Sequence, residues 1–171
     1  QLVAVEGTGA FQLSSDEPPK RLVVDKYSRS ARGSGGRFDL PYFMHDPEKT
    51  ILVVGTAGDA AGQRDAALIL QNHIRMMHIN FDVPIVTDKE VSDEQLKNNH
   101  LLLIGRPATN RITARFADAF PIRFGPQSFA VDDELYAHPK SAVMAAGGNP
   151  LNPRFSAVVI AGNSALSTYQ A

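Results

Sequence analysis

Short apolar runs alternate with longer amphipathic segments along most of the chain. Four of the runs are rich in aliphatic residues and are each followed by glycine, a pattern typical of strands buried on both faces of a parallel sheet. These runs are residues 51–54, 100–104, 142–146 and 155–161. A shorter run, residues 83–86, contains Pro84, which favours an edge position or the start of a strand.

Helices are predicted between these runs. Asp59 can cap a helix that continues through Met77, because Ala67, Leu70, Ile74 and Met77 recur every three or four residues and form one apolar stripe. This stripe is expected to lie against the sheet.

Three further helices are predicted from their caps and apolar positions. Ser92 with Gln95 three residues later fits a capping box. Another helix is predicted over residues 108–119, with its apolar residues on one face, and a last one begins at Asn163 and Ser164. Residues 122–131 are predicted to be extended, and residues 136–139 to form a turn.

Strands that alternate with helices predict an α/β protein, because right-handed crossovers place helices on both faces of the sheet. We therefore expect a three-layer sandwich with a mostly parallel sheet of four or five strands. The pattern leaves the strand order open, and a flavodoxin-like order is the first expectation.

The chain divides into three segments by composition. Residues 1–27 contain two short β-like runs, 2–5 and 21–24, and are predicted to form a β-hairpin appendage. Residues 28–49 begin with a small, basic, glycine-rich stretch and are predicted to be a flexible linker. Residues 50–171 are predicted to form the α/β domain.

Composition excludes several classes of protein. The 171 residues suit one domain with a small appendage, and 17 basic against 18 acidic residues leave a net charge of -1. This balance argues against nucleic-acid binding, and no apolar run is long enough to span a membrane. The absence of Cys from the sequence excludes disulfides and thiolate zinc sites. Because the chain starts at Gln1 and ends soon after its last predicted helix begins, we expect a piece of a longer polypeptide.

Amide and small polar side chains follow the predicted strands. In open α/β sheets, ligands bind beyond the carboxyl ends of the strands, so the turns after them are expected to meet on one rim. Amides suit neutral partners such as sugars or peptides and are poor acids and bases. The candidate ligand-binding residues are Thr56, Arg106, Asn110, Asn149, Asn152, Asn163 and Ser164. The alternative is that they cap helices and turns. Arg106 could hold a carboxylate or bind nearby carbonyl groups.

Cofactor and metal motifs are not found in the sequence. Gly55, Gly58 and Gly62 are spaced by three and four, unlike the dinucleotide fingerprint, and no phosphate-binding P-loop motif occurs. No histidine pair has the spacing of a helical zinc site, so no metal or other cofactor is expected. The acidic residues 132–134 could bind calcium weakly, but a solvated turn explains them better.

Ser164 is the one candidate nucleophile. It lies in a predicted strand–turn–helix, as in α/β-hydrolases, but the second glycine of that motif is missing. All five histidines precede it, whereas the usual base follows the serine. We therefore predict that Ser164 caps a helix and that no catalytic residue is present, with a serine hydrolase kept as an alternative.

The strand and turn segments resemble a known type of module. Those that carry the resemblance are residues 51–56, 101–110, 149–153 and 158–162. Together they resemble an α/β module appended to large secreted or periplasmic bacterial hydrolases of the prolyl-oligopeptidase type. The similarity covers roughly residues 50–165, and the segment before the first strand, residues 39–44, departs from the glycine- and proline-rich entry expected there.

The resemblance implies an accessory role, because the catalytic domain of such hydrolases lies elsewhere in the chain and no catalytic residue can be transferred. It also implies a secreted or periplasmic location, with other domains of the same polypeptide as partners. The expected function is a non-catalytic accessory or interaction domain. The alternative is a module that binds a peptide or carbohydrate in the Asn- and Gly-lined crevice.

Overall fold

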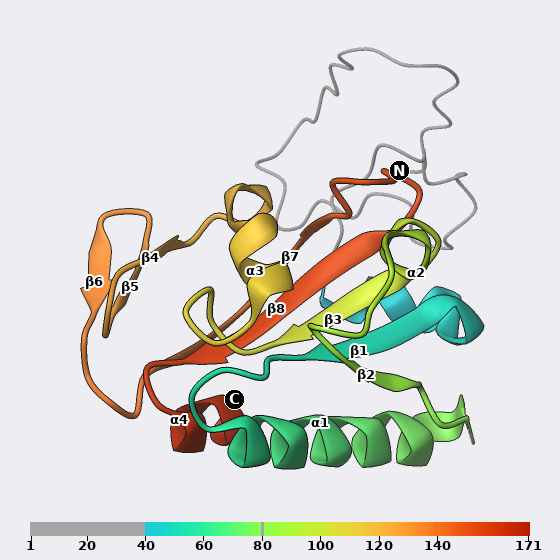
Figure 1. Cartoon of the computed structure of the whole chain (residues 1–171), viewed down its shortest axis with the longest axis horizontal. Helices are drawn as coiled ribbons and strands as arrows, with labels where there is room; N and C mark the ends of the chain where they lie inside the picture. Colours follow the sequence, from blue (N-terminus) through green and yellow to red (C-terminus); the bar gives the residue numbers. More distant parts are fainter. Residues whose placement is uncertain (1–39, 80) are drawn as a thin grey trace, which may run out of the picture. The chain divides into compact units, whose positions relative to one another are not determined.

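The computed structural model describes residues 40–79 and 81–171, and Figure 1 traces their path. The predicted hairpin of residues 1–27 and the first part of the predicted linker lie outside the described residues. Residues 40–49, the end of that linker, form two short 3-10 helices, η1 (Leu40–His45) and η2 (Pro47–Lys49). Phe43 of η1 is buried in the core.

Five strands form the main sheet, in the order β2-β1-β3-β8-β7. They are β1 (Thr50–Val54), β2 (Ile85–Thr87), β3 (His100–Ile104), β7 (Ala142–Gly148) and β8 (Ser156–Gly162). Strands β2, β1, β3 and β8 are parallel, and β7 pairs antiparallel with β8 at the edge. Every residue of β1, β3 and β8 is buried, as continuous apolar runs predict. The predicted α/β class with a mostly parallel sheet is confirmed.

Helices cover both faces of this sheet (Figure 1). The helices are α1 (Ala60–Ile74), α2 (Asp93–Lys97), α3 (Arg111–Arg115) and α4 (Ala165–Gln170). Alternate residues of the strands enter two separate cores: Leu52 and Val54 pack with Ala67 of α1, whereas Val53 packs with Ile112 of α3. The two cores make the three layers of an α/β sandwich.

Two predicted helices differ from the structure. The apolar stripe of α1 does not extend to Met77, whose surface is 52% exposed. The reason is a π-helical turn, η3 (Arg75–Ile79), which changes the angular spacing of the residues that follow Ile74. The helix predicted over residues 108–119 is shorter, because it begins only after Asn110 and gives way to a 3-10 turn, η4 (Ala117–Ala119).

The segment predicted to be extended, residues 122–131, contains two short strands joined by a turn. These are β4 (Arg123–Phe124) and β5 (Phe129–Val131), which form a small antiparallel sheet with β6 (Glu134–Tyr136). In the main sheet, the four parallel strands have the first four positions of a flavodoxin-like order. The fifth position differs, because β7 precedes β8 in the chain and runs against it.

Candidate functional site

The carboxyl ends of β1, β3 and β8 meet at one end of the sheet, but not all the candidate residues are there. Thr56, Arg106, Asn110 and the pair Asn163 and Ser164 follow these strands. Because β7 is antiparallel, its last residue lies beside the start of β8, at the opposite end. The expectation that all four turns meet on one rim is therefore wrong for Asn149 and Asn152, which follow β7.

At that opposite end, both asparagines bind the backbone around the end of α2. The Asn149 side-chain amide donates to the carbonyl oxygens of Leu96 at 2.7 Å and Asn99 at 3.0 Å. The Asn152 amide donates to the Lys97 carbonyl at 3.0 Å. These bonds satisfy carbonyl groups that a helix end leaves without intrahelical partners, so both residues join the β7–β8 connection to α2.

Asn110 is fully buried and uses its whole side chain within the fold. Its amide nitrogen donates to the carbonyl oxygens of Val53 and Ile104, each at 3.0 Å. Its oxygen accepts from the backbone nitrogens of Ile112 and Thr113, which caps α3. Both amide protons and the oxygen are thus engaged, and the side chain links β1, β3 and α3.

The crevice between the ends of β1 and β3 is filled by the protein itself. The backbone nitrogen of Ala57 donates to the Thr109 carbonyl at 3.1 Å, so the two turns bind each other. A Cβ atom at Gly55 would collide with that carbonyl and with the buried side chain of Gln63. Gly105, with a φ of +106°, lies equally close to Gln63. Glycines are needed here for close approach of the two turns rather than for binding a phosphate.

Arg106 is buried and holds the turn between β4 and β5. Its guanidinium donates to the carbonyl oxygen of Ser128 at 2.9 Å and to that of Gly125. Burial lowers the pKa of Arg106. The side chain therefore binds carbonyl groups, the second of the two roles considered for it above.

Asn163 and Ser164 connect the end of β8 to the loop before β7. The Asn163 amide donates to the carbonyl oxygens of Tyr136 and His138. Ser164 is the N-cap of α4 in a reciprocal capping box with Ser167, and its hydroxyl contacts the Pro139 carbonyl oxygen at 2.9 Å. Among the described residues, no histidine binds Ser164, and its predicted capping role is confirmed.

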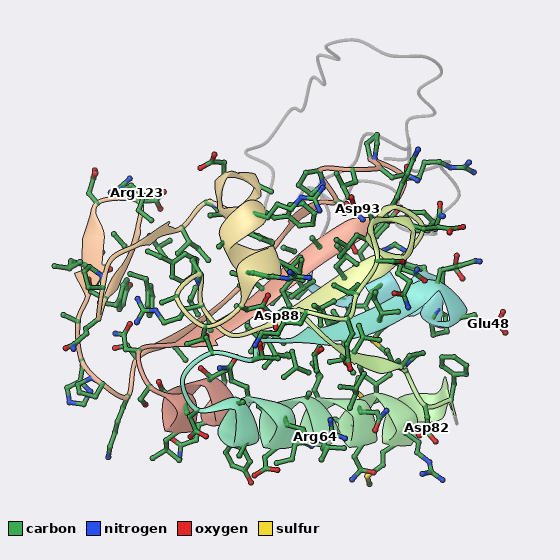
Figure 2. The ribbon with its side chains drawn as sticks, viewed as in Figure 1. Glu48, Arg64, Asp82, Asp88, Asp93 and Arg123 are labelled. Carbon is green, nitrogen blue, oxygen red and sulfur yellow. The ribbon has the colours of Figure 1, made fainter. Side chains whose placement is uncertain are left out.

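Three buried polar atoms lack a hydrogen-bond partner within the described part of the chain. They are Thr56 Oγ1, Asp88 Oδ1 and Asn163 Oδ1. Asp88, which was not among the candidates, directly follows β2. Its Oδ2 atom accepts a hydrogen bond from the backbone nitrogen of Arg111 at 2.9 Å. In Figure 2 it lies among the strand ends, whereas Glu48 and Arg123 lie at the periphery. Its position after a strand was the signal that could have identified it.

His100 occupies the opposite end of the sheet, at the start of β3. Its Nδ1 atom accepts from the Ser156 backbone nitrogen at 2.9 Å, which requires the neutral ring with the proton on Nε2. Burial lowers the pKa of His100 and exceeds the opposing effect of Asp46. Tyr42 and Phe155 approach the ring edge-on. The site is a structural link between β3 and β8.

An open apolar groove of about 560 Å³ lies along β7. Its lining residues all have apolar side chains, and they come from η1, from the segment before β4, from β5 and from β7 itself. They are Leu40, Pro41, Pro121, Ile122, Val131, Val143, Met144, Ala145 and Ala146, and together they are called the β7 groove. No other strand of residues 40–79 and 81–171 pairs with the outer side of β7. Sequence reasoning missed this groove, because it depends on β7 being an edge strand.

Within residues 40–79 and 81–171, no three acidic or histidine side chains are grouped closely enough to hold a metal ion. In the same residues, every helix is too short or too polar to cross a bilayer. Comparison with known proteins adds no assignment: no protein-family model matches the chain, and no curated protein matches it.

Proposed function

We propose that this chain is a non-catalytic interaction domain of a larger protein, and that the β7 groove is its interaction surface. The observation that carries this proposal is an uncharged strand at the sheet edge, bordered on both sides by apolar side chains. Edge strands present unpaired N–H and C=O groups, which bind extended polypeptide by adding a strand to the sheet. Apolar side chains around those groups favour an apolar partner segment.

Three of the polar candidate residues at the strand ends support the same proposal. Catalysis or ligand binding requires side chains whose donors and acceptors are available to a substrate. Asn110 and Arg106 instead bind backbone groups, and Ser164 caps α4. Because these side chains have structural roles, the β7 groove is the surface that best suits a partner.

The kind of larger protein follows from the resemblance alone. A parent hydrolase of the prolyl-oligopeptidase type would carry its catalytic domain elsewhere in the chain and would act in the periplasm or outside the cell. We propose that the present domain is an accessory part of such a protein and contributes binding rather than chemistry.

Two measurements on the purified chain test this function. First, ester and peptide substrates should show no turnover above buffer, and the variant Ser164→Ala should behave identically. Second, in dilute, monomeric protein, a synthetic peptide with the sequence of residues 142–148 between added terminal lysines should raise the melting temperature, because it can pair with the β7 edge. Hydrolysis that disappears in Ser164→Ala, or the absence of any shift with the peptide, would contradict the proposal.

A further inference from the structure

We propose that the partner of the β7 edge is a second copy of this chain, paired antiparallel through β7 around a two-fold axis at Ala145. This inference rests on the proposed function, because it names the occupant of the same surface. A pair of this kind would join two five-stranded sheets into one continuous sheet.

The pairing with β8 determines which backbone groups of β7 point outward. The Asn163 nitrogen donates to the Ser141 carbonyl, and the Asn149 nitrogen donates to the Phe155 carbonyl. In an antiparallel ladder, hydrogen-bonded residues alternate with residues whose backbone groups point to the other side. Because residues 141 and 149 bond toward β8, the odd-numbered positions between them do so too. The outward groups therefore belong to Ala142, Met144, Ala146 and Gly148.

This outward set is complementary to itself. An antiparallel pair centred on Ala145 places Ala142 opposite Gly148 of the second copy, and Met144 opposite Ala146 of the second copy. All four outward residues then meet another outward residue, so each can exchange backbone hydrogen bonds. Among these four residues the only large side chain is that of Met144, and it would lie beside the small side chain of Ala146 of the second copy, which leaves room for it across the pair.

Charge favours the same partner. Strand β7 contains no charged residue and no proline, the features with which monomeric proteins usually block pairing at an edge. Identical strands repel each other when like charges lie opposite, and this strand has none. The nearest charge in sequence, Lys140, would lie opposite Pro150 of the second copy, and therefore not opposite itself.

The walls of the β7 groove would be covered by their own counterparts. Ile122 and Val131 pack in the same core as Val143 and Ala145, which places them on one face of the sheet. Leu40 and Pro41 belong to η1, whose Phe43 packs in the other core. A two-fold axis perpendicular to the sheet keeps each face on its own side, so each apolar wall meets the same wall of the second copy and leaves water.

A cysteine substitution tests the register directly, since the wild-type chain contains no Cys. Residue 145 faces itself in the proposed pair, at a Cα separation of about 4.5 Å, which a disulfide can bridge. Ala145→Cys should therefore form a covalent dimer in oxidised glutathione at low micromolar protein. In the control Ala142→Cys, the two sulfurs would lie about 20 Å apart, and the chain should remain uncrosslinked. Equal crosslinking of both variants would contradict the register.

The mass in solution tests the pair itself. Sedimentation of the wild-type full chain should give a dimer whose fraction increases with concentration, and Met144→Lys should shift the dissociation constant at least tenfold toward monomer. Met76→Lys is the matched control, because Met76 is 74% exposed and lies outside the groove, and it should sediment as the wild type does. A wild-type chain that stays monomeric at high micromolar concentration overturns the inference. If that chain still binds the peptide of residues 142–148, the proposed function stands without it.

Discussion

At the scale of single residues, His100 makes the stability of the fold depend on pH. Its Nδ1 atom accepts a hydrogen bond from Ser156, and burial lowers its pKa below the usual 6.5. The unfolded chain therefore binds a proton more readily than the folded one, so this contribution to stability is complete above pH 6.5 and decreases as the pH falls below it. The slope is at most about 1.4 kcal/mol per pH unit for one proton.

The first prediction is that the free energy of unfolding decreases more steeply between pH 7 and pH 5 in the wild type than in His100→Asn. Asparagine can still accept from the Ser156 nitrogen but does not titrate. Urea denaturation at a series of pH values measures both curves. His73→Gln, at an exposed position of α1, is the control and should follow the wild type. Parallel curves for the wild type and His100→Asn would show that His100 is not the titrating group.

Asn110 leads to the second prediction, because one side chain satisfies four backbone groups. Asn110→Ala removes the cap of α3 and leaves the carbonyl oxygens of Val53 and Ile104 without that donor. The Ile104 carbonyl oxygen keeps its bond from the Gly55 nitrogen, so the substitution removes hydrogen bonds without leaving that group unpaired. A lost cap and a lost hydrogen bond each cost about 1 kcal/mol, so the unfolding free energy should decrease by about 2 kcal/mol or more. Asn72→Ala, at an exposed helical position, should change it by less than about 0.5 kcal/mol. A loss in Asn110→Ala as small as in the control would contradict the assigned role.

At the scale of elements, the strands that are buried on both faces could be predicted from the sequence. Runs such as residues 51–54 and 100–104 are buried on both faces, a pattern typical of strands inside a parallel sheet. The capping box of Ser92 and Gln95 was equally predictable, because it is local. The start of the short α3 was not, since Asp88, which follows β2, binds its first residue, and carbonyl groups of β1 and β3 hold its N-cap Asn110.

The main error in predicting the site was to treat β7 as parallel. The length of the connection between β7 and β8 could have corrected it. A run of small apolar residues reads the same in either direction, so composition does not distinguish parallel from antiparallel. Only residues 149–155 connect β7 to β8, however, and a parallel crossover needs about a dozen residues or more. With that constraint applied, Asn149 and Asn152 would have been placed at the opposite end of the sheet.

The third prediction distinguishes the two sides of β7. Ala145→Pro removes a nitrogen that bonds toward β8, and should destabilise the fold by about 3 kcal/mol or more. Ala146→Pro removes a nitrogen on the outer side and should cost much less in dilute protein, while also preventing uptake of the peptide of residues 142–148. Urea denaturation of both variants below the dimer dissociation constant measures the difference. Equal losses would contradict the assignment of outward groups to the even-numbered positions.

At the scale of the whole molecule, self-pairing couples folding to concentration. A net charge of -1 gives two copies little long-range repulsion, so the contacts along β7 decide the equilibrium. Because a dimer dissociates as it unfolds, its melting temperature rises with protein concentration. The fourth prediction is a rise of about 2 °C for each tenfold increase in wild-type concentration. Calorimetry over a hundredfold range would measure it, and Met144→Lys should melt at one temperature throughout. A wild-type melting temperature that does not vary with concentration would mean that the folded chain unfolds as a monomer.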